Sequence, residues 1–525
     1  MDEKYILTID LGTSGPKVGI FDSKGRTQSI AVEETQLIVG DGGLAEQSPA
    51  DWWQAICKAS AKALKSFPLG AEKISAIGVT TLWSGTVAVD KDHNPLGNCL
   101  MWMDTRGARY IREITGGFPS IEGYGVLQLM EWVNITGGIP SLSGKDPIAH
   151  ILYLKNERPD IYRDAWKFLE PKDYINLVLT GRAAAGFDSI AAHWLCDTRN
   201  IDKIDYHSGL LSRSGITREK LPDLCLSTEI LGELKAKPAS DLGLPAGIPV
   251  VCGTPDIHSA CIGSGAVRDY EGHLYIGTSS WISAHVPFRK TDVMHKIATL
   301  PSAIPGRYFI ANEQETSGES LRFLINNIFF ADDEFKTVKP NNIYELCNQI
   351  ASRVPPGSQG LIFTPWLFGE RTPVENATIR GGFHNLSLHH TRADMIRSVF
   401  EGVAFNLRWL LKYVEEFQGR PFQYLNFIGG GARSELWCQI LADVLQRPIR
   451  PVNEPVEANA RGVALLTSVS MGYTTFDKIS DDIGIDRTFT PQKSNESLYN
   501  DMFKEFLNIY KNDSEIHARM NKGNH

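Results

Sequence analysis

The stretch that decides the fold is residues 7–14, Leu-Thr-Ile-Asp-Leu-Gly-Thr-Ser, an apolar strand pattern that runs into a Gly-Thr-Ser turn. About half a chain later, residues 274–279 (Leu-Tyr-Ile-Gly-Thr-Ser) repeat this arrangement. Two such elements predict an internal duplication, in which two related lobes face one another across a cleft. The alternative is a chance repeat, because Gly-Thr-Ser residues are common in turns.

The residues around the first strand fit an α/β protein. Residues 17–21 resume the strand pattern after the turn, and residues 51–67 place apolar side chains at helical spacing. Further strand patterns follow at residues 74–79 and 85–89, and strands and helices continue to alternate. This alternation favours the α/β class.

The chain has 525 residues, which is more than one hydrophobic core usually supports. We expect an N-terminal lobe over residues 1–266 and a C-terminal lobe over residues 267–525. The C-terminal lobe should end in a helix and a polar tail over residues 511–525.

Composition excludes several classes of protein. The 53 Lys and Arg residues against 61 Asp and Glu give a formal charge of −8 without a basic block, which argues against a nucleic-acid partner. The N-terminus lacks the basic start and apolar stretch of a signal peptide, and no run reaches membrane-spanning length. The eight cysteines show no CxxC spacing, which favours reduced, mostly buried thiols. We therefore expect a cytoplasmic protein without membrane contact.

A third glycine cluster lies late in the chain. The apolar stretch 425–428 runs into Gly429, Gly430 and Gly431, and a helical pattern follows at residues 435–445. A strand, a glycine turn and a helix form a layout in which backbone N–H groups can approach a phosphate or nucleotide. A turn without a ligand is the alternative. The cluster does not match GxGxxG, and the chain contains no GxxxxGK[ST] motif.

Eleven short strings, taken in order over nearly the whole chain, resemble the FGGY carbohydrate kinases, a family that includes glycerol kinases and xylulose kinases. The strings are residues 9–15, 46–53, 102–106, 171–174, Asp256, 277–279, 363–373, 380–383, 401–404, 429–431 and 457–462. The resemblance implies two actin-like (ribonuclease-H-like) lobes with a catalytic cleft between them. It also implies transfer of the γ-phosphate of ATP, with Mg²⁺, to a hydroxyl of a sugar or polyol.

Two aspartates carry the predicted chemistry. Asp10 ends the first strand, where a carboxylate can hold Mg²⁺ through water; a turn-initiating aspartate is the alternative. By resemblance, Asp256 is the base that accepts the proton of the sugar hydroxyl; the alternative is an N-cap for the helix that follows. The sequence departs from its relatives here, because Ile257 stands where they often carry glutamine.

The nucleotide should lie against small residues from both lobes. We expect these ATP contacts: Gly12, Thr13, Ser14, Lys17, Gly277, Thr278, Gly429, Gly430 and Gly431. In the second lobe the counterpart of Asp10 is Tyr275 or Ile276, so only the first lobe carries this carboxylate.

The carbohydrate pocket should involve Trp83, Ser84, Trp102 and Asp104. An indole face can stack on the C–H surface of a sugar, and a hydroxyl or carboxylate can bind its oxygens. Residues 83–84 keep neither the Arg-Glu of glycerol kinases nor the Met-His of xylulose kinases. Nearby, Trp366, Glu370, Arg371 and Arg380 are interpreted as scaffold, with Glu–Arg pairing beneath the cleft.

The opening of the chain is closest in pattern to xylulose kinases, so a ketopentose such as xylulose is the first substrate expected. Other ketoses, tetritols and glycerol remain alternatives. So do a binding protein of the same fold with little catalysis and an actin-like ATPase scaffold. The sequence leaves the oligomeric state open, a homodimer included.

Overall fold

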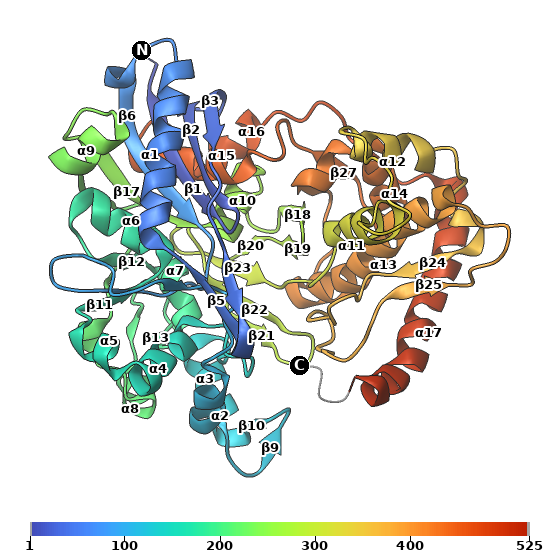
Figure 1. Ribbon diagram of the computed structural model, residues 1–525, viewed down its shortest axis with the longest axis horizontal. Coiled ribbons are helices and arrows are strands. Elements are labelled where there is room, and N and C mark those ends of the chain that lie inside the picture. Colours follow the sequence, from blue (N-terminus) through green and yellow to red (C-terminus); the bar gives the residue numbers. More distant parts are fainter. Residues whose placement is uncertain (1–2, 522–525) are drawn as a thin grey trace.

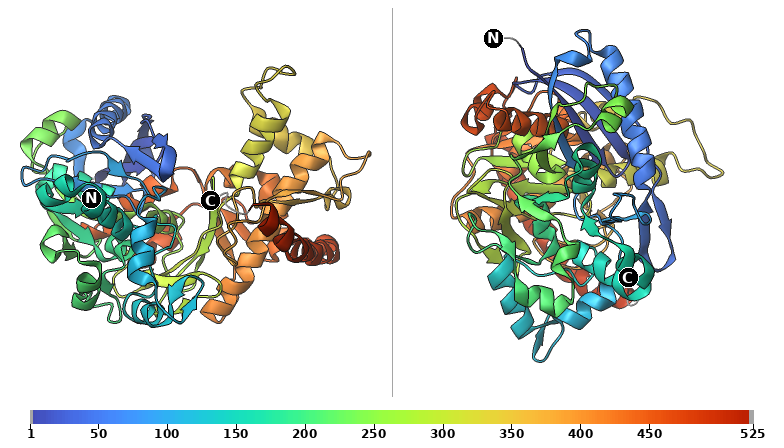
Figure 2. Two further views of the ribbon diagram at one scale, coloured as in Figure 1. Left: turned by 60° about the horizontal axis from the view of Figure 1, so that its bottom comes forward. Right: turned by 90° about the vertical axis from the view of Figure 1, so that its left-hand side faces the viewer.

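The computed structural model describes residues 3–521, which form two lobes joined along one side (Figures 1 and 2). The first lobe is built on a six-stranded sheet and the second on a four-stranded one. Each lobe has its own large core of buried apolar side chains.

The first sheet has the order β16-β17-β6-β1-β2-β3. Its strands are β1 (Tyr5–Gly12), β2 (Gly15–Asp22), β3 (Thr27–Val32), β6 (Ile74–Thr81), β16 (Ile230–Glu233) and β17 (Pro249–Pro255). Strand β1 pairs antiparallel with β2 and parallel with β6, and β6 pairs parallel with β17. The central position of β1 explains why its residues 5–11 are all buried.

Helices cover both faces of this sheet. Leu7, Ile9 and Leu11 join the core beside α1 (Pro49–Ser66), whereas Ile6 on the opposite face packs with α15 (Ala458–Ser470). This division follows from the two-residue period of a strand.

The second sheet repeats the layout of the first, in the order β19-β18-β26-β27. Its strands are β18 (Gly272–Ile276), β19 (Ser280–Ser283), β26 (Leu425–Ile428) and β27 (Ile449–Pro451). Strand β18 pairs antiparallel with β19 and parallel with β26, and β26 pairs parallel with β27, as β1 does with β2 and β6 in the first lobe. The predicted duplication and the two actin-like lobes are therefore confirmed. Aligned on Gly-Thr-Ser, Tyr275 is the counterpart of Asp10.

The remaining elements complete the two lobes. In the first half these are β4 (Ile38–Gly40), β5 (Leu44–Gln47), β7 (Val87–Val89), β8 (Cys99–Leu100), α2 (Ala108–Thr115), β9 (Ser120–Ile121), β10 (Tyr124–Gly125), α3 (Val126–Thr136), α4 (Pro147–Glu157), α5 (Pro159–Asp164), β11 (Lys167–Leu169), α6 (Pro171–Thr180), β12 (Ala184–Gly186), α7 (Phe187–Ile190), β13 (Cys196–Asp197), β14 (Asp205–Tyr206), α8 (Ser208–Ser214), β15 (Asp223–Cys225), α9 (Ala236–Leu242) and α10 (Asp256–Gly263). In the second half they are β20 (His285–Val286), β21 (Thr291–Asp292), β22 (Ile297–Pro301), β23 (Tyr308–Ala311), α11 (Gly318–Phe323), α12 (Ile343–Ala351), β24 (Ile362–Thr364), β25 (Gly382–His384), α13 (Arg392–Gln418), α14 (Glu435–Leu445), α16 (Phe476–Asp482) and α17 (Glu496–Met520).

The end of the chain differs from expectation. Helix α17 continues through Lys511 to Met520, so most of the predicted polar tail is helical. Its buried residues Tyr499, Met502 and Phe506 belong to the core of the second lobe, which explains why the helix is ordered. Residues 522–525 lie outside the described part of the chain.

Seven of the eight cysteine side chains are buried, and Cys57 is partly so. Among the helices of residues 3–521, none combines the length and the apolar character that a membrane crossing requires.

Helices α10 and α15 pack together at backbone distance, although about 200 residues separate them. A β-carbon on Gly263 would lie 1.8 Å from the carbonyl oxygen of Ala458, and one on Gly462 would lie 1.8 Å from that of Ser259. The Arg461 guanidinium also donates to the Gly263 carbonyl at 2.9 Å. A helix from the second half of the chain thus fixes α10, which begins at the predicted catalytic base (Figure 1).

Gly462→Ala should destabilise the protein, because a methyl group forces α15 away from α10 and overpacking of this kind costs about 1–3 kcal/mol. The measurement is the melting temperature. Gly97→Ala is the matched control, since its new β-carbon meets nothing closer than 3.7 Å. Equal melting temperatures for Gly462→Ala and the control would contradict the close contact.

Candidate active site

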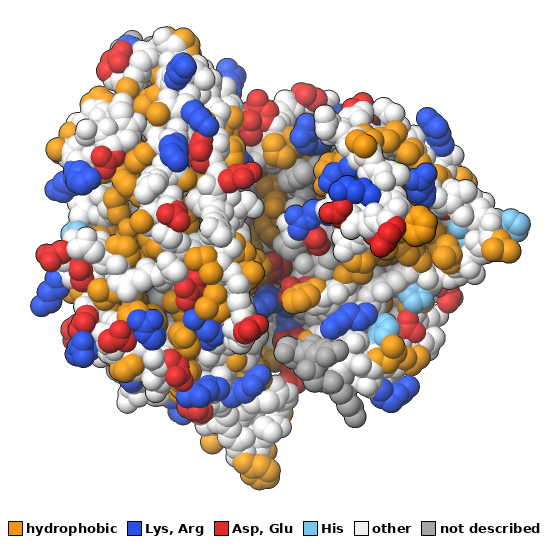
Figure 3. Space-filling view, in the orientation of Figure 1, with side chains coloured by type: hydrophobic (Ala, Val, Ile, Leu, Met, Phe, Trp, Pro, Cys, Tyr) orange, Lys and Arg blue, Asp and Glu red, His pale blue; other side chains and the backbone are white. Residues whose placement is uncertain are grey.

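A furrow runs between the two lobes (Figure 3). The turns after β1 and after β18 carry the predicted phosphate-binding residues. Asp10 and Glu313 both act electrostatically on Asp256, and all three carboxylates act on the Tyr275 hydroxyl. Side chains from both halves of the chain therefore share one site.

Asp10 lies on β1 with 7% of its surface exposed. Lys17 is its partner across the β1–β2 pair, with Nζ 3.8 Å from the carboxylate, while the same Nζ donates to the Val456 carbonyl at 2.9 Å. Burial raises the pKa of Asp10, and Lys17 only partly opposes that rise. A buried carboxylate with so little positive charge beside it fits a bound cation.

The surroundings of Asp10 also indicate how a cation would be held. Among residues 3–521, no group of three or more His, Cys, Asp or Glu side chains forms a metal cage. Mg²⁺ needs none, because it commonly binds one or two carboxylates, several waters and the phosphates of a nucleotide. The donor set at Asp10 therefore suits Mg²⁺ that arrives with its nucleotide.

Asp256 is the first residue of α10, directly after β17. The N-cap position belongs to Pro255, so the alternative interpretation of Asp256 as the N-cap is wrong. One carboxylate oxygen accepts the Ile257 N–H at 2.8 Å. Burial, followed by the negative charge of Asp10, raises the pKa of Asp256 to about 7. A carboxyl group with a pKa near neutral pH is suited to accept a proton as a general base.

One of the residues predicted to bind the carbohydrate, Trp102, contacts the turn after β1, which carries Thr13. The Trp102 indole donates to the Thr13 hydroxyl at 3.2 Å, and Gln47 donates to the Thr13 carbonyl at 2.7 Å. The Trp83 indole donates to the Ser189 carbonyl at 2.9 Å, and Ser84 follows in a left-handed conformation with φ +64°. Trp83, Ser84 and Trp102 are all partly exposed, as a ligand contact requires.

The side chain of Asp104 is engaged inside the protein, contrary to the prediction that it contacts the carbohydrate. It is fully buried, and its carboxylate accepts the Ala45 N–H at 3.0 Å together with the backbone and guanidinium N–H groups of Arg106. Arg106 also pairs with Glu46 at 2.5 Å. The carboxylate oxygens of Asp104 are engaged by donors within the protein, so the prediction that Asp104 contacts the substrate is wrong.

The turn after β18 is held by the segment 312–318. The N–H groups of Ser317 and Gly318 donate to the carbonyls of Thr278 and Gly277, each at 2.9 Å. Gly429 has φ +90°, and a β-carbon there would lie 2.4 Å from the Ile276 carbonyl oxygen, so a residue without a side chain is required. The predicted strand, glycine turn and helix are all present, and the helix spans Glu435–Leu445 as expected.

Sequence reasoning missed Glu313, which follows β23 at the edge of the site. Its carboxylate pairs with Arg371 at 2.7 Å, and Arg371 also lies 3.3 Å from Glu315. Of the expected Glu–Arg pairing, the structure shows Arg371 with Glu313 and Glu315. Glu370 instead accepts from Asn406 and from the backbone of Arg371 and Glu315. The only signal in the sequence was an acidic residue just after a strand.

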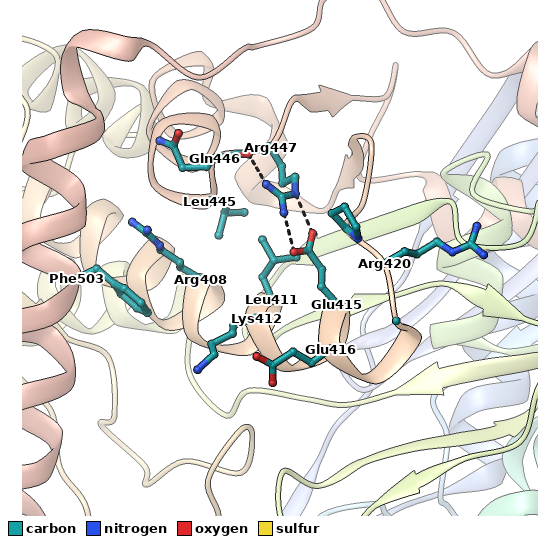
Figure 4. Close-up of a pocket in the computed structure, with 12 residues that line it drawn as sticks. Arg408, Leu411, Lys412, Glu415, Glu416, Arg420, Leu445, Gln446, Arg447 and Phe503 are labelled. Atoms are coloured by element: carbon teal, nitrogen blue, oxygen red, sulfur yellow. Dashed lines mark hydrogen bonds and ion pairs between the residues drawn. The ribbon is translucent and has the colours of Figure 1, made fainter.

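A separate pocket of about 640 Å³ lies in the second lobe, between the ends of α13 and α14 and the side of α17 (Figure 4). A Glu415–Arg447 ion pair of 2.7 Å closes part of its wall. Its lining includes none of the predicted site residues, so it does not belong to the catalytic site.

Comparison with known proteins agrees with this geometry. The N-terminal domain of the FGGY family of carbohydrate kinases matches residues 5–263, and the C-terminal domain of that family matches residues 273–471. The chain belongs to the FGGY family of carbohydrate kinases. It is therefore a phosphotransferase that acts on an alcohol group of a small carbohydrate.

Individual relatives of this FGGY kinase carry different substrate names. The chain is 28% identical to a gluconokinase of Bacillus subtilis, over 96% of this chain and 95% of that protein. It is also 28% identical to a xylulose kinase of Staphylococcus epidermidis, over 99% of each. The relatives therefore leave the substrate open.

Solved structures show the same fold. A gluconate kinase from Lactobacillus acidophilus aligns with a TM-score of 0.85 at 23% identity, over 99% of this chain and 100% of that one. A xylulose kinase from the same organism also gives 0.85 at 23% identity, over 98% and 100%.

Asp256→Asn should lower the turnover number at least about a hundredfold, because the amide cannot accept the proton. At pH 8 the melting temperature of the variant should not be lower than that of the wild type. The pKa of Asp256 is higher in the folded protein than its usual value near 4, so the charged form costs stability as pH rises above that value. Turnover and melting temperature are measured together; near-normal turnover would refute the assigned role.

The pH profile should report the same carboxylate. Since Asp256 must be charged to act, kcat/KM for the carbohydrate should be present above pH 7 and fall about tenfold per unit below it. Coupled ADP release at constant ionic strength gives the profile. A profile that stays flat through pH 7 while the melting temperature is constant would contradict the prediction.

Proposed function

We propose that this FGGY kinase transfers the γ-phosphate of MgATP to a hydroxyl of a neutral ketose, with a xylulose-type pentulose as the first candidate. The observation that carries the proposal is the pair formed by the buried Asp10 and the partly buried Asp256, in which the charge of Asp10 contributes to the raised pKa of Asp256. Phosphoryl transfer requires a carboxylate that holds the metal and a base that accepts the proton of the attacking hydroxyl, and we assign these roles to Asp10 and Asp256.

The residues of the chain divide the work. Gly12, Thr13, Gly277 and Thr278 lie in the two turns that would hold the phosphates, and the glycines 429–431 would line the adenosine side. Mg²⁺, when bound at Asp10, would neutralise the negative charge of the phosphates. Asp256 would take the proton from the sugar hydroxyl onto its carboxylate as that hydroxyl attacks.

The carbohydrate would lie on the first lobe. The Trp83 and Trp102 indoles offer faces for the C–H surface of a sugar, and the Ser84 hydroxyl offers one polar contact. Because the Trp102 indole is bonded to Thr13, a sugar on this wall would lie beside the phosphate turn. This supports direct transfer from nucleotide to sugar, with water kept from the phosphate.

A coupled ADP-release assay over a panel of sugars tests the proposal. Xylulose and other ketopentoses should raise ADP release well above the sugar-free rate, more than glycerol, tetritols or gluconate do. Trp83→Ala should raise KM for the preferred sugar about two- to tenfold, since an aromatic contact of this kind contributes about 0.5–1.5 kcal/mol. Sugar-independent hydrolysis of ATP would favour a scaffold ATPase, and binding without ADP release would favour a sugar-binding protein.

A further inference from the structure

Glu313 has no role in the proposed function, yet it lies on the segment 312–318, which holds the turn after β18. Residues 312–318 begin after β23, and their backbone pairs with Ser280 through Gln314 and with Thr278 through Ser317. The Ser317 hydroxyl also contacts that of Ser280 at 2.6 Å. Glu313 is therefore fixed relative to the turn after β18.

Glu313 belongs to a rigid acidic cluster. Arg371 lies 2.7 Å from Glu313 and 3.3 Å from Glu315. The Glu370 carboxylate accepts the backbone N–H groups of both Arg371 and Glu315, at 2.8 Å and 3.1 Å. This double contact fixes the backbones of Arg371 and Glu315 relative to one another.

The ion pairs of this cluster and of Asp10, taken together with Asp256, leave an excess of negative charge. Asp10, Asp256, Glu313 and Glu315 provide four carboxylates, whereas Lys17 and Arg371 provide two cations. Burial lowers the pKa of the Arg371 guanidinium, but the negative charges around it outweigh this effect and raise the pKa. These charges belong to Glu313, Glu315, Asp146 and Glu375. The charge of Arg371 is thus already matched by carboxylates, and none is left over for an anionic sugar.

One-third of the Glu313 side chain is exposed, so its carboxylate can still accept further hydrogen bonds. A carboxylate that faces a polyhydroxy substrate accepts hydrogen bonds from its hydroxyls, whereas it repels a second carboxylate in a site of low dielectric. The same group thereby attracts one class of carbohydrate and rejects another.

We propose that the Glu313–Arg371 pair is the contribution of the second lobe to the carbohydrate site, and that Glu313 makes the enzyme select neutral ketoses over sugar acids. This inference rests on the proposed function and adds to it a specificity residue from the other side of the furrow. Glu313 would accept hydrogen bonds from hydroxyls of the bound sugar.

The test compares a ketopentose with gluconate as phosphoryl acceptors, for the wild-type protein and three variants. The wild type should show a kcat/KM at least about tenfold higher for the ketopentose. Glu313→Gln should raise the gluconate-to-ketopentose ratio of kcat/KM at least about tenfold, with the ketopentose loss mainly in KM. Glu313→Asp keeps the charge and should keep the exclusion of gluconate.

Glu131→Gln is the matched control. Glu131 pairs with Arg213 at the same 2.7 Å, and its side chain is 32% exposed against 33% for Glu313, but it lies on α3, away from the residues of the site. It should leave the ratio unchanged. Melting temperatures of all variants show whether loss of an ion pair alone changes the fold.

A folded Glu313→Gln whose ratio equals that of the wild type would overturn the inference while the proposed function stands. A wild type that prefers gluconate would overturn both. If neither compound, nor any other sugar of the panel, raises ADP release by the wild type, the proposed function fails and the inference fails with it. The wild-type measurement shows whether the proposed function fails. If Glu313→Gln does not fold, Glu313→Asp tests the inference, because a folded Glu313→Asp that has lost the exclusion of gluconate would overturn it.

Discussion

The contact between α10 and α15 is the constraint on which the site depends. Two helices can approach to backbone distance only where both lack side chains, and here Gly263 and Gly462 meet the facing carbonyl groups. The contact places the N-terminus of α10, and with it Asp256, at the edge of the first sheet where β17 ends. The proposed catalytic carboxylate is thereby held by elements from both halves of the chain.

An excess of buried negative charge is the second organising feature. The positions of Asp10 and Asp256 are unfavourable in the free protein, because desolvation raises the pKa of both carboxyl groups and Lys17, 3.8 Å from Asp10, only partly opposes the rise there. Folding of the rest of the molecule must offset this cost, and the bound metal and substrate would relieve it. A site that is electrostatically incomplete without its ligands binds them tightly for that reason, whereas a fully paired site would gain little from them.

Local patterns predicted much of this structure. The repeated Gly-Thr-Ser turns, the strand that carries Asp10 and the helix over residues 435–445 depend on neighbours in the chain, and each was found where expected. Contacts between residues far apart in the chain could not be predicted from local sequence patterns. Asp104 looks like a free carboxylate until the Ala45 N–H and Arg106 are seen to occupy it, and Glu313 carries no motif at all. Gly462 in a helix of small residues does not reveal which helix it will meet.

The position of α15 has a consequence for synthesis of the protein. Ile6, Phe21 and Ala76 pack against Ala460 and Ala464, which the ribosome adds some four hundred residues later. While the nascent chain is being made, one apolar face of the first sheet has no cover, so this lobe cannot fold to completion as an independent N-terminal unit. Its maturation must wait until nearly nine-tenths of the polypeptide has emerged, which leaves a long interval in which a chaperone can bind that face.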